Sequence, residues 1–215
     1  MNDIEQNYQK YLKKAQEHKA TLVAASKKQS LDKIKKWLDE RASNETVHLG
    51  ENYCSELLIK AEALKGYPIK WHFIGSIQSK DLRKISVVAD YIHTISRQKE
   101  LKYLKGYKGR FFIQINISNE RSKSGLLSQD LGEFYEDLKA NNLHDSCEGL
   151  MSIGSSLSQV GLDVVDSEMK QLKEIRDKIN EDWKLSLGMS NDYEIALKND
   201  SKYIRVGSAI FGQRT

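Results

Sequence analysis

Short apolar segments alternate with longer amphipathic segments along most of the chain, and this alternation constrains the fold more than any other feature. The apolar segments are expected to form strands, over residues 21–25, 46–50, 69–74, 91–95, 110–117, 148–153, 184–187 and 202–206. The segments between them carry apolar residues at helical spacing, over 30–43, 53–65, 79–89, 98–105, 127–140, 163–181 and 192–198. Strands that alternate with helices form a parallel sheet, because parallel neighbours need a crossover connection.

Eight such units in a chain of 215 residues predict a closed (β/α)8 barrel, the TIM barrel. A doubly wound open sheet is the alternative. It is less favoured because the first strand lacks the Gly-x-Gly-x-x-Gly turn of dinucleotide-binding folds, and because the chain has no Walker A loop. We therefore expect one domain over residues 1–215, with an extra N-terminal helix within 1–18 and the barrel within 21–212.

The composition excludes several classes of protein. The net charge of +4 arises from 34 basic and 30 acidic residues spread along the chain, which is not the charge pattern of a nucleic-acid-binding protein. Cys54 and Cys147 lie far apart without histidines at metal-ligand spacing, so neither a zinc site nor a disulfide framework is expected. No apolar run approaches the length of a membrane span, and the N-terminus does not resemble a signal peptide. These features predict a cytoplasmic protein.

The C-terminal ends of barrel strands converge on one mouth, where barrel enzymes place their functional side chains. The residues expected there are Lys27, Asn52, His72, His93, Asn116, Met151, Ser190, Arg205 and Gly207. Of these, His72 and His93 are more typical of hydrogen-bonded packing residues than of catalysts. No Ser-His-acid arrangement and no paired-carboxylate motif is evident from the spacing.

The last two strands end in turns that resemble phosphate-binding sites. One turn runs from Gly188 to Ser190 and the other from Gly207 to Ser208. Glycine turns expose backbone N–H groups, and Ser190 is placed to cap the helix expected over 192–198. In barrel enzymes these last two strand-to-helix loops often hold phosphate.

Lys27 and Arg205 add two specific chemical functions to this mouth. Lys27 follows a wholly apolar strand, where partial desolvation favours the neutral amine that attacks carbonyl groups. Arg205 can only donate hydrogen bonds, so a pyridine nitrogen facing it stays unprotonated. A ligand with both an aldehyde and a phosphate would use the lysine and the turns together, and pyridoxal 5′-phosphate fits that description. The alternatives are a surface lysine and an arginine in a rim salt bridge.

Several motifs together resemble the pyridoxal phosphate homeostasis protein family, in order from about residue 21 to 212. These motifs are Ser26-Lys27, Gly50-Glu51-Asn52-Tyr53, Trp71-His72-Phe73-Ile74-Gly75, Gln78-Ser79, Gln114-Ile115-Asn116, Lys123-Ser124-Gly125, Gly149-Leu150-Met151, Leu185-Ser186-Leu187-Gly188-Met189-Ser190 and Arg205-Val206-Gly207-Ser208-Ala209-Ile210-Phe211-Gly212. One departure is Lys80-Asp81, where Asn-Lys is usual after Gln-Ser, and it leaves the role of the 78–84 loop open.

The resemblance implies a single barrel like the N-terminal domain of alanine racemase, which holds pyridoxal phosphate (PLP) without a dedicated reaction. It implies that Lys27 forms the Schiff base, that Arg205 approaches the pyridine nitrogen and that Asn52 lies near the ring. The residues implied around the phosphate are Met189, Ser190, Gly207 and Ser208. The expected role is intracellular PLP homeostasis by a monomer, with PLP-dependent apoenzymes as candidate partners, and with no membrane or nucleic-acid partner.

The alternative function is a small PLP-dependent racemase or related amino-acid enzyme. Such enzymes carry a C-terminal domain that supplies a second base, and this chain stops at Thr215, directly after the eighth strand motif. Lys27 is then the single evident base, whereas proton removal from both faces of a substrate needs two. A third interpretation is an interaction module that uses the lysine-rich helix within 27–36, which is more typical of a solvated helix face.

Overall fold

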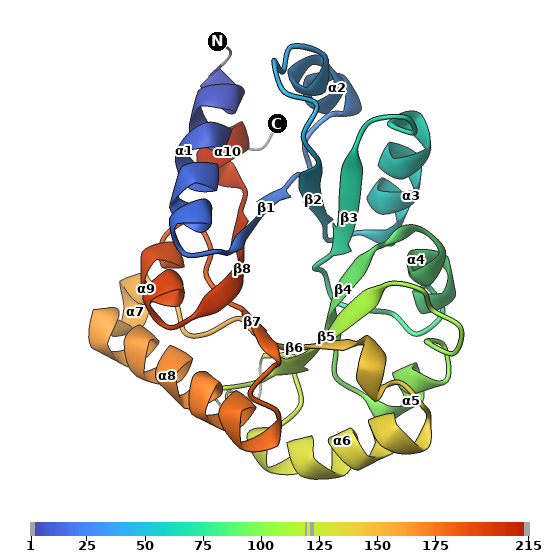
Figure 1. Ribbon diagram of the computed structural model, residues 1–215, viewed down its shortest axis with the longest axis vertical. Helices are drawn as coiled ribbons and strands as arrows, with labels where there is room; N and C mark the ends of the chain where they lie inside the picture. The colour runs from blue at the N-terminus through green and yellow to red at the C-terminus, as the bar shows by residue number, and fades with distance from the viewer. Residues whose placement is uncertain (1–2, 119, 121–122, 213–215) are drawn as a thin grey trace.

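The computed structural model describes residues 3–118, 120 and 123–212. Within these residues, eight parallel strands pair in chain order, and β8 pairs with β1 to close the barrel (Figure 1). The strands are β1 (Thr21–Ala25), β2 (Val47–Glu51), β3 (Ile69–Phe73), β4 (Tyr91–Ile95), β5 (Arg110–Ile115), β6 (Cys147–Ser152), β7 (Lys184–Ser186) and β8 (Ser201–Val206). The predicted barrel is confirmed, and the open-sheet alternative is wrong.

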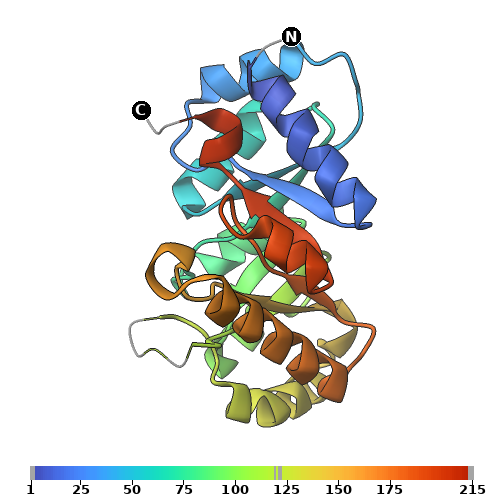
Figure 2. The same ribbon diagram turned by 90° about the vertical axis from the view of Figure 1, so that its left-hand side faces the viewer.

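Helices surround the barrel and connect its strands (Figures 1 and 2). The α-helices are α1 (Asp3–Glu17), α2 (Leu31–Asp39), α3 (Cys54–Ala63), α4 (Leu82–Val88), α5 (Gln98–Leu101), α6 (Leu131–Ala140), α7 (Leu157–Val160), α8 (Leu162–Ile179), α9 (Tyr193–Lys198) and α10 (Ser208–Phe211). Two short 3-10 helices, η1 (Ser128–Asp130) and η2 (His144–Ser146), precede α6 and β6. The sequence pattern did not predict the short helices α7 and α10, and α4 begins later than expected.

The strands are apolar along their length because both of their faces are buried, each against one of two apolar layers, as is usual for parallel strands. The larger core lies between the barrel and the helices. A smaller cluster of Val23, Phe112, Met151 and Tyr203 fills part of the interior. Gly149 lets β6 approach β7, because a side-chain Cβ there would lie 1.9 Å from the Lys184 carbonyl oxygen.

The N-terminal helix packs across the junction between the first and last units. α1 contacts both β1 and α10, so the beginning and end of the described chain lie side by side (Figure 2). Its buried face consists of Ile4, Glu5, Tyr8, Tyr11 and Ala15. The helix therefore belongs to the same packed unit as the barrel.

Candidate functional site

A pocket of about 420 Å³ opens at the C-terminal ends of the strands. It is lined by all seven of the ligand-binding residues expected from the sequence, namely Lys27, Asn52, Met189, Ser190, Arg205, Gly207 and Ser208. These residues follow or end strands β1, β2, β7 and β8, so closure of the barrel is what brings them together. The convergence predicted from the strand ends is found for the residues on these four strands.

Four other residues expected at the mouth do not line this pocket. His72 and His93 are fully buried and hydrogen-bonded to each other, and Met151 lies in the interior apolar cluster. Asn116 donates from Nδ2 to the carbonyl oxygens of Glu120 and Lys123, at 2.9 and 3.2 Å. That part of the prediction is wrong, because sequence position near a strand end does not fix which barrel layer a side chain enters.

Lys27 lies on a tight turn between β1 and α2. Ser26 is fully buried, Lys27 is half-buried and Lys28 is exposed. Lys28 has a φ of +57°, in the left-handed region that few non-glycine residues adopt. Ser30 ends the turn by capping α2, since its side chain accepts a hydrogen bond from the Lys33 amide at 3.3 Å. The cap at Ser30 confirms the predicted start of this helix.

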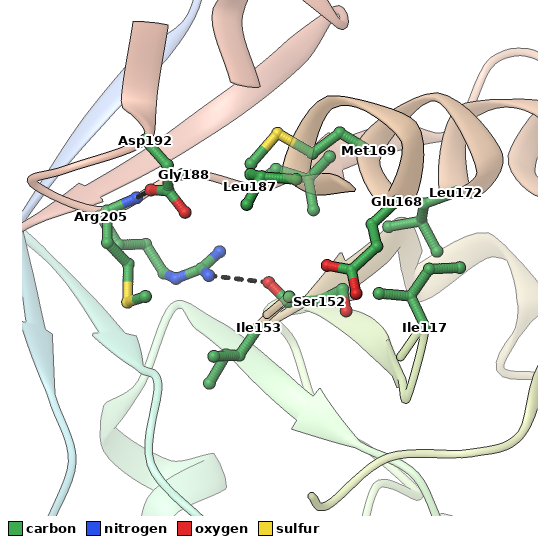
Figure 3. A pocket seen from close by; sticks show the side chains of 13 residues that line it. Ile117, Ser152, Ile153, Glu168, Met169, Leu172, Leu187, Gly188, Asp192 and Arg205 are labelled. Carbon is green, nitrogen blue, oxygen red and sulfur yellow. Dashed lines mark hydrogen bonds between the residues drawn. The ribbon is translucent and has the colours of Figure 1, made fainter. Parts of the chain in front are cut away.

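Arg205 is 6% exposed and reaches from β8 toward the C-terminal ends of β7 and β6. Its Nη1 donates to the carbonyl oxygen and the Oγ of Ser186, both at 2.7 Å. Its Nη2 donates to the Ser152 carbonyl oxygen at 3.0 Å (Figure 3). Burial lowers the pKa of Arg205 to about 10, and the Asp192 carboxylate acts in the opposite direction. The guanidinium is thus charged at neutral pH, and among the described residues it is held by neutral oxygens and forms no salt bridge.

A chain of hydrogen bonds runs from Arg205 into the barrel through Ser186. Ser186 Oγ lies 2.8 Å from His93 Nδ1, and His93 Nε2 lies 2.8 Å from His72 Nδ1. His72 Nε2 in turn lies 2.8 Å from Nδ1 of His48, which is only partly buried. Burial lowers the pKa of all three histidines, so they are neutral at physiological pH. They are packing residues that hold the arginine, not groups facing a ligand.

The two glycine turns lie side by side at the mouth. Gly188 has a φ of +88°, and a Cβ on Gly207 would lie 3.0 Å from the Ala25 carbonyl oxygen, so both positions favour glycine. Asp192, not Ser190, occupies the N-cap position of α9, and its Oδ1 accepts from the Met189 amide at 2.5 Å. The predicted capping by Ser190 is wrong, which leaves its partly exposed hydroxyl at the pocket surface.

A narrow apolar crevice of about 10 Å³ lies behind Arg205, between α8 and the ends of β6 and β7 (Figure 3). It has room for about one water molecule and cannot hold a larger ligand. Glu168 on α8 closes it by accepting from the Ser155 amide and hydroxyl, at 2.7 and 2.6 Å. This contact fixes the loop after β6. Because the crevice is too small for a ligand, we expect a ligand to bind in the wider mouth.

The sequence reasoning missed the contribution of the loop after β6. Pocket-lining residues from this loop are Ile153, Gly154, Ser155, Ser156, Leu157 and Gln159. Lys123 also lines the mouth, and its Nζ lies 2.6 Å from Glu120 Oε1 and 3.3 Å from the Gly154 carbonyl oxygen. The run Gly154-Ser155-Ser156 marks a strand end in the sequence, but nothing in it specifies that the following turn folds back over the mouth.

The barrel and its mouth define a protein of the alanine racemase N-terminal domain class, and the model of that family matches residues 1–215. Curated relatives named pyridoxal phosphate homeostasis protein include one from Schizosaccharomyces pombe, 35% identical over 78% of this chain and 74% of the relative. Another, from Pasteurella multocida, is 30% identical over 98% of this chain and 94% of the relative. The chain belongs to the pyridoxal phosphate homeostasis protein family.

Solved structures share the fold. PipY of Synechococcus elongatus, determined without and with PLP bound, is 22% identical with a TM-score of 0.72, over 90% of this chain and 93% of PipY. Alanine racemase of Streptomyces lavendulae is 13% identical with a TM-score of 0.74, over 99% of this chain but 59% of the racemase. At these identities the likeness concerns the barrel itself. Across the part of the chain that the structure describes, no helix has the length and apolar character needed to cross a membrane.

Proposed function

We propose that this protein binds pyridoxal 5′-phosphate at the barrel mouth, attached covalently to Lys27, and serves intracellular PLP homeostasis without a dedicated catalytic reaction. The observation that carries the proposal is that Lys27, Arg205 and the two glycine turns line one pocket. The names of the curated relatives and the PLP-bound structure of PipY support the same ligand.

The donors and acceptors of the mouth fit this cofactor. An aldehyde needs an amine, which Lys27 supplies, and an unprotonated pyridine nitrogen needs a donor, which Arg205 supplies. The hydroxyls of Ser190 and Ser208 and the amides of their turns suit a phosphate. Asn52 Oδ1 is buried without a hydrogen-bond partner among the described residues, so a ligand donor would satisfy it.

The same residues argue against efficient amino-acid chemistry. Bound PLP would supply an electron sink for carbanions, but a charged Arg205 facing the ring nitrogen would keep that nitrogen unprotonated and so weaken the sink. A racemase also needs a second base opposite Lys27. Besides Lys27 and Arg205, the titratable groups among the described residues of the mouth are Lys123, which is held by Glu120 and the Gly154 carbonyl, and Asp192, whose Oδ1 accepts from the Met189 amide. The racemase alternative is therefore disfavoured.

The finer assignments follow from this proposal. The seven residues expected to bind the ligand lie in one chain, and the proposal takes the monomer as the binding unit. PLP-dependent apoenzymes are the implied recipients, and the cytoplasm is the compartment in which the protein would supply them.

The test is replacement of Lys27 by alanine, with Lys28→Asn as the matched control. Asparagine tolerates the left-handed backbone at position 28, so the control removes a neighbouring amine without disturbing the turn. The protein is incubated with PLP, reduced with borohydride and mapped by peptide mass spectrometry, and racemase and transaminase assays are run on the same sample. We expect an adduct on Lys27 in the wild type and in Lys28→Asn, its loss in Lys27→Ala, and no turnover. An adduct that persists in Lys27→Ala refutes the attachment site, and clear turnover would favour the alternative function, a racemase or related amino-acid enzyme.

A further inference from the structure

The turn that carries Lys27 is held on both sides by hydrogen bonds from other elements. On the N-terminal side, the Ser26 amide donates to the Gly50 carbonyl oxygen at 2.9 Å, and the Ser26 carbonyl oxygen accepts from Lys60 Nζ at 2.8 Å. On the C-terminal side, the Lys28 amide donates to Glu56 Oε2 at 2.8 Å. Lys27 is thus the residue between two anchored neighbours.

These anchors belong to one cluster of charged side chains. Glu51 Oε1 accepts from Lys60 Nζ at 2.7 Å and from Ser26 Oγ at 2.6 Å, and Lys60 Nζ also lies 2.9 Å from Glu56 Oε2. The Glu51 side chain is fully buried, and that of Lys60 is 5% exposed. We call Ser26, Glu51, Glu56 and Lys60 the brace.

The brace contributes little to the stability of the fold, because burying its charges costs desolvation free energy, and it therefore suggests a further role. A buried ion pair loses hydration on both charges, and apolar residues of similar volume often stabilise a protein as well or better. Glu51 Oε2 is buried with no hydrogen-bond partner among the described residues, which adds to the desolvation cost. The role that remains is conformational, because the left-handed backbone of Lys28 persists only where its surroundings impose it.

We propose that Glu51 and Lys60 are positioning residues that hold the Lys27 turn in the geometry required for capture of an aldehyde at the mouth. The proposal rests on the proposed function for the identity of the ligand. The ammonium of Lys60 has three N–H donors, and all three are used, by Glu51, Glu56 and the Ser26 carbonyl. Lys60 therefore orients the turn, and it cannot replace Lys27 as the attacking amine.

The test uses the variants Glu51→Gln, Lys60→Met and the double variant, at pH 8. Glutamine keeps an acceptor for Ser26, and the double variant leaves no unpaired buried charge, so it is expected to fold. The matched control is Arg176→Met, since the Arg176 side chain is also buried, at 6% exposed, and hydrogen-bonded, but to Trp183 and Asp200 on the opposite side of the barrel from the mouth. Ser26→Ala removes only the hydroxyl contact and serves if Lys60→Met does not fold.

Two readouts separate positioning from folding. The first is hydrogen exchange of the backbone amides of residues 26–30 in the protein without cofactor. The second is the rate of PLP attachment to Lys27, trapped by borohydride and mapped. We expect the double variant to exchange these amides at least about tenfold faster and to attach PLP at least about tenfold more slowly, because small misplacements of a reacting group have effects of this size or larger. Arg176→Met should match the wild type in both readouts.

Unchanged exchange and attachment in a folded double variant would overturn the proposal. Accelerated exchange in Arg176→Met equal to that in the double variant would also overturn it, since the effect would then be general loosening. Failure of the wild type to attach PLP at Lys27 would defeat the proposed function instead, and the exchange readout would still decide whether the brace holds the turn.

Discussion

Glu51 is a fully buried acid, so its charge state couples folding to pH. Burial raises the pKa of Glu51 from 4.5 to about 7, and the charge and hydrogen bonds of Lys60 and Ser26 limit the rise. Between these two pH values the folded protein retains a proton on Glu51 that the unfolded chain has lost. The stabilisation from this proton is therefore complete below pH 4.5 and is lost as the pH rises to about 7.

We predict that the free energy of unfolding of the wild type, relative to Glu51→Gln, falls by about 3 kcal/mol as the pH rises through this range. Glutamine does not titrate, so the difference between the two proteins isolates Glu51. Denaturant titrations of both proteins between pH 4.5 and 8 measure it. A difference that is constant with pH would contradict the raised pKa. In Lys60→Met the fall should extend to higher pH, because the cation that favours the carboxylate is gone.

Single residues were predictable from the sequence where the neighbouring residues in the chain determine their surroundings. Lys27 and Arg205 were identified because they lie next to or within apolar strands, and both line the mouth pocket. The brace was not predicted. Its members are separated by up to 34 residues. Glu51 ends a strand and Lys60 lies in an ordinary helical pattern, and neither position in the sequence indicates that the side chain is buried.

At the scale of elements, strands β2, β3, β4, β7 and β8 together build the hydrogen-bond chain that supports Arg205. Arginine can only donate, so Ser186 Oγ accepts from it and directs its own proton to His93 Nδ1. His93 then carries its proton on Nε2 and donates it to His72 Nδ1, and His72 likewise donates to His48. The guanidinium thereby sets one tautomer along the whole chain.

We predict that nitrogen-15 NMR finds His72 and His93 neutral and protonated on Nε2. Ser186→Ala should weaken the tautomer preference of His93, because its Nδ1 loses the hydroxyl donor. Ser152→Ala is the control, since Ser152 contacts Arg205 through its carbonyl oxygen alone. An Nδ1-protonated His93 in the wild type would contradict the prediction.

Because the pKa of both histidines is lowered on folding, their contribution to stability is present above pH 6.5 and is lost as the pH falls below it.

The element order was predictable because each barrel strand is a short apolar run followed by a helical pattern, and all eight predicted strands are present among the described residues. The short helices α7 and α10 were missed because four residues are too few to show a helical period. They matter for the site, since α7 and α10 lie at the loops after β6 and β8. Tertiary contacts such as Glu168 to Ser155, not local sequence pattern, hold the first of these loops.

At the scale of the whole molecule, α1 joins the two ends of the barrel sequence. Glu5 Oε2 accepts from Trp37 Nε1 of α2 at 2.7 Å. Tyr11 packs edge-on against Tyr193 of α9, with ring centroids 5.0 Å apart, and Trp37 packs in the same way against Phe211 of α10 at 5.5 Å. The sequence predicted a helix within residues 1–18, but not the elements that it covers, because those contacts connect distant parts of the chain.

We predict that deletion of residues 1–18 lowers the thermal midpoint by at least about 10 °C. The deletion exposes apolar surface that Ile4, Tyr8, Tyr11 and Ala15 cover. Burial of each large side chain contributes roughly 1.5–3 kcal/mol to the free energy of unfolding. For a chain of this size, each kcal/mol lost lowers the thermal midpoint by about 2–4 °C. Calorimetry measures the loss. Glu5→Leu, which leaves the Trp37 N–H without its acceptor, should cost about 1–3 kcal/mol, whereas Glu5→Gln should cost less because its amide oxygen can still accept. An unchanged midpoint in the deletion protein would show that the barrel closes and stays closed without α1, and that the helix is an appendage and not part of the folding unit.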